Sequence, residues 1–461
     1  MSKYISRRTF IYMGAATLAA GCATKGGKKT AGPRKVSPND KLNIAAIGSG
    51  GKGGSDIAGC SKENVVALCD VDWANAAETF AKFPDAKQYK DFREMLDKES
   101  IDAVTISTPD HFHAIAAMAA MERGIHVYVQ KPLTHTVWEA RLLTEAARKY
   151  KVKTQMGNQG RSGEGVRQLT EMIWGGAIGQ VREVHCWTNR PIWPQGLDRP
   201  DKTDAIPDTL DWDLWLGPAP ERPYVDKHPV TNEKCYCPFV WRGWWDFGCG
   251  ALGDMACHIM DPAFYSLQLG YPTSFELVTQ EGRSSEMAPN KSIVKFDFPE
   301  RVAPDGKKMD PVAVYWYDGG LMPPMPEGLP ADTKLGEGNN GSLFIGDKGM
   351  ATTGTYGDGS RLLPDAVNEA YQRPEPFLPR VKGSHYTDWI SAIKGEQEQA
   401  GSYFDYAGPF SETVLLGNLA VRCGEAGQKF EWDAKAMKIT NVPEANQFVS
   451  KEYRKGWEIS L

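Results

Sequence analysis

Short apolar runs alternate with amphipathic segments between residues 40 and 160. Each run is shorter than a typical helix and has the continuous apolar character of a buried parallel strand. The segments at 114–123 and 137–150 instead show the spacing of a helix with one apolar face. The apolar runs cover residues 42–47, 65–69, 103–107, 127–129 and 153–156. Strands and helices that alternate in this way predict a parallel sheet with right-handed helical crossovers.

The pattern changes in the second part of the chain. A helix is predicted to extend past His258 to Leu269, and short β-like runs follow it. These runs fit one large, mostly antiparallel sheet with a helical face, completed by amphipathic helices at 386–394 and 409–423. The predicted strands cover residues 275–279, 292–298, 312–317 and 341–345. The fold class is therefore α/β plus α+β, with an N-terminal domain at 39–160 and a second domain at 161–461, whose last segment packs back on the first.

The first residues resemble an export signal, so we do not expect them to form part of the folded domains. A basic start at Lys3 is followed by residues 6–11, Ser-Arg-Arg-Thr-Phe-Ile, which resemble a twin-arginine signal. The apolar run at 10–20 is too short to span a membrane, which takes roughly 20 residues. We expect export by the twin-arginine route to a bacterial periplasm or cell envelope. The alternative is a cytosolic protein with a frayed basic terminus.

Residues 18–22, Leu-Ala-Ala-Gly-Cys, are similar to a lipoprotein cleavage site. Leu18 lies one place earlier than that pattern prefers, so acylation of Cys22 is left open. A membrane contact is expected only through such a lipid. The Gly-, Lys- and Pro-containing stretch at 23–38 is typical of a flexible tether, which makes 1–38 a signal and tether.

Charge and cysteine spacing exclude two classes of site. The formal net charge is −5 with a pI near 6.0, so no nucleic-acid partner is expected. Cys235, Cys237, Cys249 and Cys257 do not have the spacing of the usual zinc-binding pairs, and no metal is expected.

A glycine-rich turn follows the first strand directly. Residues 48–53, Gly-Ser-Gly-Gly-Lys-Gly, fit G-x-G-x-x-G at a strand-to-helix turn. Glycines let the backbone approach a pyrophosphate, and a helix N-terminus offers free N–H groups to it. Asp70 ends the second strand 22 residues after Gly48, where a carboxylate accepts from ribose hydroxyls and repels a 2′-phosphate. The sequence thus predicts a Rossmann domain that binds NAD through Gly48, Gly50, Gly51, Gly53 and Asp70.

Polar clusters follow three other predicted strands. Ligands bind at the carboxyl ends of such strands. The cofactor candidates there are Thr108, Pro109, His113, Gln130, Lys131 and Asn158. For His113 the alternative is packing at the start of a helix, and for Asn158 it is capping of a loop.

The order of these motifs is similar to that of the glucose–fructose oxidoreductase and inositol dehydrogenase family (Gfo/Idh/MocA). The resemblance rests on the glycine turn, Asp70, Thr108-Pro109 with His113, Lys131-Pro132, and the Asp-x-x-x-His of residues 254–258. It implies that Lys131 and His258 face the nicotinamide and the substrate carbon, and that the Lys-Pro bond is cis. It also implies oligomer contacts through the second sheet, hence a homodimer or homotetramer. The family usually has Glu-Lys-Pro where this chain has Gln130, a change expected to lower the lysine pKa.

Lys131, Asp254 and His258 are the predicted catalytic residues. Asp254 and His258 are four apart, so on a helix they share a face. An imidazole can take the proton of an alcohol, Asp254 could accept from its other nitrogen or touch the substrate, and Lys131 would stabilise the alcohol oxygen. The alternative is a structural Asp–His pair.

Tryptophans are concentrated between residues 181 and 245. Most are expected in the core, but one or two are expected to pack on a sugar ring. The substrate candidates are Arg161, Trp193, Arg242 and Trp244.

Three functions remain open at this stage. The first is an NAD-dependent oxidoreductase that acts on a hydroxyl of a sugar or glycoside. The second is an NAD-dependent glycoside hydrolase that works by transient ring oxidation, elimination and re-reduction. The third is a non-catalytic sugar-binding surface lipoprotein, against which the presence of Lys131, Asp254 and His258 argues.

Overall fold

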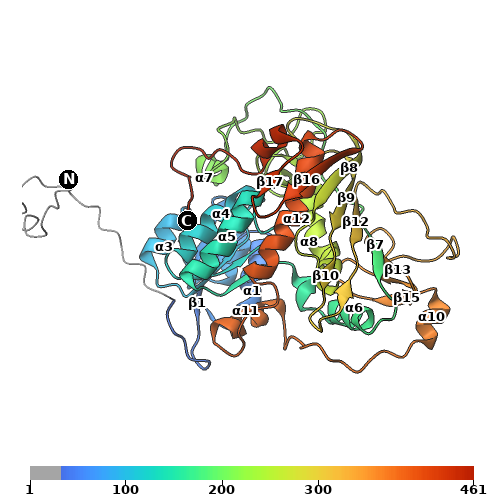
Figure 1. The fold of residues 1–461 in the computed structure, drawn as a ribbon. Helices are drawn as coiled ribbons and strands as arrows, with labels where there is room; N and C mark the ends of the chain where they lie inside the picture. Colours follow the sequence, from blue (N-terminus) through green and yellow to red (C-terminus); the bar gives the residue numbers. More distant parts are fainter. Residues whose placement is uncertain (1–32) are drawn as a thin grey trace, which may run out of the picture.

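The computed structural model describes residues 33–461. The expected export signal and Cys22 lie outside the described residues. Two sheet-based halves lie side by side, with α5 and α12 between the two sheets (Figure 1). No helix within 33–461 has the length and apolar character needed to cross a membrane. The eight cysteines of this range are all free thiols.

The first half is the predicted parallel sheet. Six strands pair in the order β3-β2-β1-β4-β5-β6, with each neighbouring pair parallel. The strands are β1 (Asn43–Ile47), β2 (Asn64–Cys69), β3 (Lys87–Tyr89), β4 (Ala103–Ile106), β5 (His126–Val129) and β6 (Thr154–Met156). The helices are α1 (Lys52–Gly59), α2 (Trp73–Lys82), α3 (Phe92–Lys98), α4 (His113–Met121) and α5 (Val137–Tyr150). The Rossmann prediction is confirmed.

The N-termini of α5 and α1 differ in their capping, which determines whether their N–H groups can bind a ligand. The Thr136 hydroxyl accepts from Glu139 N, and Glu139 accepts from Thr136 N, which closes a capping box at the start of α5. The N-terminus of α1, preceded by Gly51, has no side-chain cap. Its N–H groups therefore remain available to a ligand.

The second half contains a nine-stranded sheet in the order β15-β14-β13-β7-β12-β9-β8-β16-β17. β7 and β12 run parallel and the other neighbours antiparallel, so the sheet is mostly antiparallel as predicted. The strands are β7 (Val181–Trp187), β8 (Ser274–Glu281), β9 (Lys291–Phe298), β12 (Val312–Tyr317), β13 (Gly341–Gly346), β14 (Met350–Thr353), β15 (Arg361–Leu363), β16 (Gln428–Asp433) and β17 (Lys438–Ile439). A separate hairpin joins β10 (Arg301–Val302) and β11 (Lys308–Met309).

One predicted helix is divided in the structure. The segment expected to continue to Leu269 forms α8 (Gly250–Ile259) and α9 (Asp261–Ser266), because Pro262 starts a new first turn. The remaining helices are α6 (Glu164–Trp174), α7 (Trp212–Leu216), α10 (Asp365–Ala370), α11 (His385–Ile393) and α12 (Phe404–Cys423). Short 3-10 turns are η1 (Asp110–Phe112), η2 (Gln159–Ser162), η3 (Val240–Gly243) and η4 (Pro443–Phe448).

α12 joins the two halves. It packs on α5 and β6 of the first half and on α8, β8 and β9 of the second. Arg141 of α5 forms two hydrogen bonds of 2.7 Å with Glu412 of α12, whose side chain is buried. Asn418 of α12 donates to Cys249 O beside α8 at 3.0 Å. The last segment of the chain, predicted to pack back on the first domain, contacts it as well. Tyr453 donates to Glu139 of α5 at 2.7 Å. The Trp457 ring meets the Phe112 ring edge-on.

The described part of the predicted tether contacts the first half. Arg34 forms a two-pronged ion pair with Asp102 at 2.5 and 2.6 Å. Val36 packs against the neighbouring apolar cluster. Residues before position 39 therefore contact the first half.

Candidate active site

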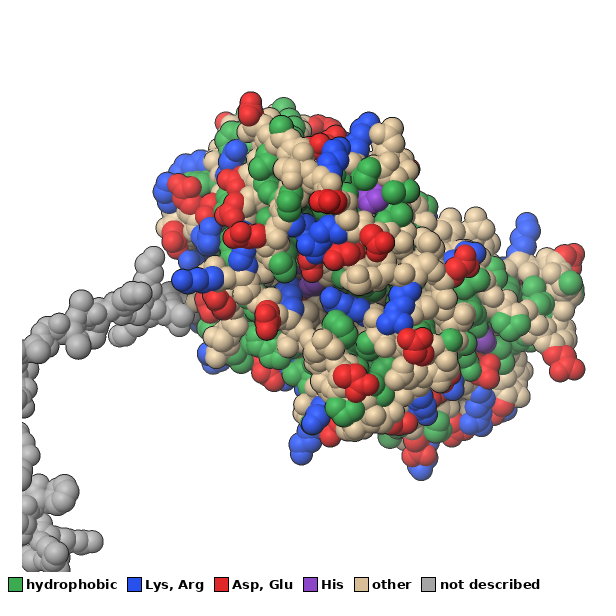
Figure 2. Space-filling model, turned by 90° about the horizontal axis from the view of Figure 1, so that it is seen from above, with side chains coloured by type: hydrophobic (Ala, Val, Ile, Leu, Met, Phe, Trp, Pro, Cys, Tyr) green, Lys and Arg blue, Asp and Glu red, His purple; other side chains and the backbone are tan. Residues whose placement is uncertain are grey.

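A cavity of about 580 Å³ lies at the carboxyl ends of the parallel strands. It is walled by strand ends of the first half and by α8 and loops of the second. Figure 2 shows the molecule hollowed between its halves, with basic side chains around the hollow. Its size is that of an ordinary cofactor or ligand site.

The glycine turn forms one end of this cavity. Gly48 has φ +80°, and a Cβ added there would lie 2.7 Å from Ser107 O. A Cβ on Gly53 would overlap the carbonyl oxygen of Gly48. Gly51 has φ +52° and open space where a Cβ would project. These positions require glycine and leave the backbone of the turn exposed to a bound phosphate.

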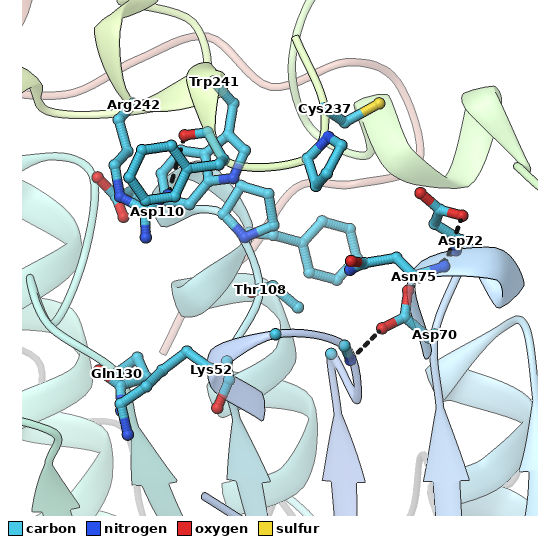
Figure 3. Close-up of a pocket in the computed structure, with 18 of the residues that line it drawn as sticks. Lys52, Asp70, Asp72, Asn75, Thr108, Asp110, Gln130, Cys237, Trp241 and Arg242 are labelled. Carbon is cyan, nitrogen blue, oxygen red and sulfur yellow. Dashed lines mark hydrogen bonds between the residues drawn. The ribbon is translucent and has the colours of Figure 1, made fainter. Parts of the chain in front are cut away.

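Asp70 lies against the same turn. Its carboxylate accepts from Ser49 N at 2.7 Å and from Gly50 N at 2.9 Å. Burial raises its pKa, and these backbone N–H groups oppose that rise. Asp72 also lines the cavity but caps α2 by accepting from Asn75 N. In Figure 3 Asp70, Asp72 and Asn75 are grouped on the side opposite Arg242 and Trp241.

These residues fit NAD. The Thr108 hydroxyl is buried and has no hydrogen-bond partner among the described residues. It lines the cavity with Pro109, between the glycine turn and Lys131. An uncapped helix N-terminus, a ribose-binding carboxylate and an unpartnered hydroxyl in one cavity are what a dinucleotide needs.

Lys131, Asp254 and Arg242 form an ion-pair cluster at the other end. Lys131 Nζ lies 2.7 Å from Asp254 Oδ1 and 2.7 Å from Asp254 O. Arg242 Nε donates to the same Oδ1 at 3.1 Å. Burial opposes ionisation of Asp254, but the two cations hold its pKa well below the ordinary value. The Lys131-Pro132 peptide bond is cis.

His258 lies on α8 one turn after Asp254, as expected. One alternative, a hydrogen bond from the His258 ring to Asp254, is not formed in the described residues, and Lys131 and Arg242 both bond to Asp254 Oδ1 instead. The His258 Nδ1 atom is buried and has no partner among the described residues, and its ring packs edge-on against Tyr356 at 4.9 Å. Burial lowers the pKa of His258 to about 3, so its imidazole is neutral at pH 7.

Three cofactor candidates, Gly53, His113 and Asn158, do not line the cavity. The ring nitrogens of His113 lie 2.8 Å from Pro132 O and 2.9 Å from Thr108 O, which anchors the neighbouring strand ends. Asn158 donates to Asp261 at 2.9 Å. Gln130 does line the cavity, but its amide donates to Asp56 at 2.7 Å. The charge beside Lys131 therefore comes from Asp254 and not from position 130.

Of the four substrate candidates, two line the cavity and two do not. Trp193 and Arg242 line the cavity. Arg161 does not, and its guanidinium lies 3.4 Å from the centre of the Tyr265 ring. Trp244 is 1% exposed and donates to Cys235 O, so it belongs to the core as most of the tryptophans were expected to.

The structure adds lining residues that the sequence did not single out. Asp110 accepts from Cys249 N at 3.0 Å, and burial raises its pKa to about 7. Its position directly after Thr108-Pro109 was the available signal. Ile192, Phe239 and Tyr356 also line the cavity. They carry no chemical signature in the sequence.

Comparison with known proteins supports this architecture. Residues 42–158 match the oxidoreductase family model with an NAD-binding Rossmann fold, and residues 180–315 match the C-terminal alpha/beta domain of that family. The WlbA dehydrogenase from Bordetella pertussis, in complex with NADH and UDP-GlcNAcA, has a similar fold. The TM-score is 0.57 at 16% identity, over 85% of this chain and 99% of that one.

Curated relatives match mainly the first half. Inositol 2-dehydrogenase from Serratia proteamaculans is 31% identical over 176 residues, 37% of this chain and 51% of that protein. A glycosyl hydrolase family 109 protein from Solibacter usitatus is 31% identical over 170 residues, 32% of this chain and 39% of that protein. The chain spans about half the length, or less, of these two relatives. The glycine turn, the two domains and these matches show that the chain belongs to the Gfo/Idh/MocA oxidoreductase family, with an NAD-binding Rossmann domain.

Proposed function

We propose that this protein is an NAD-dependent oxidoreductase that acts on a hydroxyl group of a sugar or glycoside. One observation carries the proposal: Lys131, Asp254 and His258 lie in the same cavity as the glycine turn and Asp70. A dinucleotide held at Asp70 and the turn would extend toward these three side chains.

When bound, the nicotinamide accepts a hydride from the alcohol carbon and can return it. Lys131 is the positive donor for the alcohol oxygen, and Asp254 at 2.7 Å orients its ammonium group. His258 is neutral and buried, which suits it to take the hydroxyl proton as the alcohol is oxidised.

The proposal also covers the cellular location and the oligomeric state of the enzyme. The twin-arginine-like residues 6–11 support export to the periplasm or envelope, where no soluble nicotinamide pool is at hand. The cofactor would then be held tightly and regenerated in each turnover. The broad second sheet would serve as the contact face of a homodimer or homotetramer.

A second candidate is supported by the family 109 relative. In this second candidate, bound NAD would oxidise a ring hydroxyl of the substrate transiently at the same site. The new ketone would acidify the adjacent C–H, and elimination would then break the glycosidic bond. Water then adds and the ketone is reduced again, so the net reaction is hydrolysis without cofactor supply.

Two measurements test these functions. Denaturing the purified protein should release NAD or NADH, close to one per chain, and no dinucleotide would contradict both candidates. Aryl glycosides then distinguish them, because release of aglycone without net NADH supports the hydrolase, whereas NADH formation supports the oxidoreductase. Sugar binding without either reaction would indicate the non-catalytic alternative.

A further inference from the structure

We propose that the mouth of the cavity is an aglycone subsite, formed by Ile192, Phe239 and Tyr356. It would bind the apolar face of the group attached to the reacting sugar, so the substrate class is a glycoside with an aromatic or similarly apolar aglycone. This inference rests on the proposed function, because it assigns the sugar to the Lys131 end of the cavity.

The first observation is that three exposed apolar side chains line one cavity. Ile192 is 63% exposed, Phe239 45% and Tyr356 39%. They come from three separate segments: the loop after β7, the residue before η3, and the turn between β14 and β15. All three line the cavity that contains the catalytic candidates. Exposed apolar side chains that converge on a cleft are typical of a ligand-binding surface.

The second observation is the backbone at Phe239. Its φ of +75° and ψ of −48° are strained for a bulky residue with a Cβ. Backbone conformations of this kind cluster at active sites and ligand-binding segments. Here the strain presents an aromatic ring to the cavity instead of burying it in the core.

The ring is also held rigidly. The Arg242 guanidinium lies 4.4 Å from the centre of the Phe239 ring, and Trp193 meets it edge-on at 5.6 Å. A fixed ring binds an apolar face with little loss of conformational entropy.

The third observation is that the charged side chains lie deeper in the cavity than the apolar side chains. Arg242 bonds to Asp254 on its inner side and contacts the Phe239 and Trp241 rings. Tyr356 contacts the His258 ring at 4.9 Å and is itself part-exposed. The charged groups that handle a hydroxyl therefore lie deeper than the apolar surface. In this arrangement the aglycone, and not the oxidised ring, would cover Ile192, which favours a glycoside over a free monosaccharide as substrate.

The test compares paired substrates on the protein with its bound cofactor. The probes are glucose, galactose and N-acetylglucosamine as methyl and as phenyl β-glycosides. Phe239→Ala and Ile192→Ala are the test variants. Val230→Ala is the matched control, because Val230 is 76% exposed and does not line the cavity.

We expect kcat/KM for the preferred phenyl glycoside to fall about 10-fold more than that for its methyl counterpart in both test variants. The ratio of the kcat/KM values for the two glycosides should be the same in Val230→Ala as in the wild type. Equal losses on both glycosides, or no loss, would overturn the subsite. Two variants are used because Phe239→Ala also changes a strained turn.

Failure of the proposed function would be recognised separately. If the wild type converts no glycoside, calorimetric titration of the phenyl glycosides still tests the subsite. Binding that weakens in Phe239→Ala but not in Val230→Ala supports it. If no phenyl glycoside binds the wild type more tightly than its methyl counterpart, the subsite is refuted. A change in oligomeric state with unchanged titrations would assign the apolar mouth to a second copy of the chain and would also refute it.

Discussion

The Gln130 amide nitrogen lies 2.7 Å from the buried Asp56 carboxylate. Asp56 also accepts from Ser107 at 2.7 Å and Tyr386 at 2.8 Å, and pairs with Lys52. A glutamate at 130, as the family usually has, would bring a second carboxylate against Asp56. The departure from Glu-Lys-Pro at position 130 is therefore matched to the Asp56 carboxylate on α1.

Restoring the family residue should harm this chain. We predict that Gln130→Glu lowers the free energy of unfolding by about 1–3 kcal/mol at pH 8, because a buried donor becomes a like charge. Urea unfolding measures the change. Adding Asp56→Asn should recover part of the loss, since the new amide at 56 could donate to the carboxylate introduced at 130. A single variant as stable as the wild type would contradict the pairing.

Removing the charge at Lys131 should stop the chemistry without unfolding the protein. For Lys131→Met we expect turnover to fall on the order of 10²–10⁴-fold, because the alcohol oxygen loses its positive donor. Reduction of bound NAD at 340 nm is the readout. The thermal midpoint and the nucleotide content serve as controls. Turnover within a few-fold of the wild type would remove Lys131 from the reaction.

Asp110 should give the stability a measurable pH dependence. Burial raises its pKa to about 7 in the folded protein, against about 3.9 when unfolded. The folded state thus binds more protons between pH 4 and 7, and the contribution of Asp110 to stability is lost as the pH rises through 7. We expect Asp110→Asn to remove a slope of up to about 1.4 kcal/mol per pH unit in this range.

Urea unfolding at pH 5 and pH 8 measures this slope. The comparison is between wild type and variant at each pH, because the buried histidines act in the opposite direction. His258, whose pKa falls to about 3, favours the folded state as the pH rises toward 6.5. Identical pH profiles for Asp110→Asn and wild type would show that Asp110 titrates normally.

Asp70 should set the choice of dinucleotide. Asp70→Asn keeps an oxygen that can accept from Ser49 and Gly50 but removes the charge. We predict that the preference for NAD over NADP, measured as a ratio of Kd values, falls roughly 10-fold or more. Asp72→Asn is the control, because Asp72 caps α2, and its effect should be smaller. An unchanged ratio in Asp70→Asn would place the 2′-hydroxyl elsewhere.

Periodicity and spacing predicted much of the fold and part of the site. Alternating apolar runs identified the parallel sheet, and the four-residue interval placed Asp254 and His258 on one helix face. They did not show that Asp254 would bind Lys131, because that partner is 123 residues away in the sequence. Likewise, nothing near Arg161 indicated that its guanidinium would lie on Tyr265.

The long helix α12 has a consequence for how reactants meet. It is fixed to α5 through Arg141 and Glu412 and to the start of α8 through Asn418. Swinging the halves apart would break a buried ion pair and uncover the shared core. The gap between the coenzyme and the proposed sugar substrate would thus be set when the chain folds, so rearrangement of surface loops, and not a hinge between the halves, would govern how fast reactants enter and products leave.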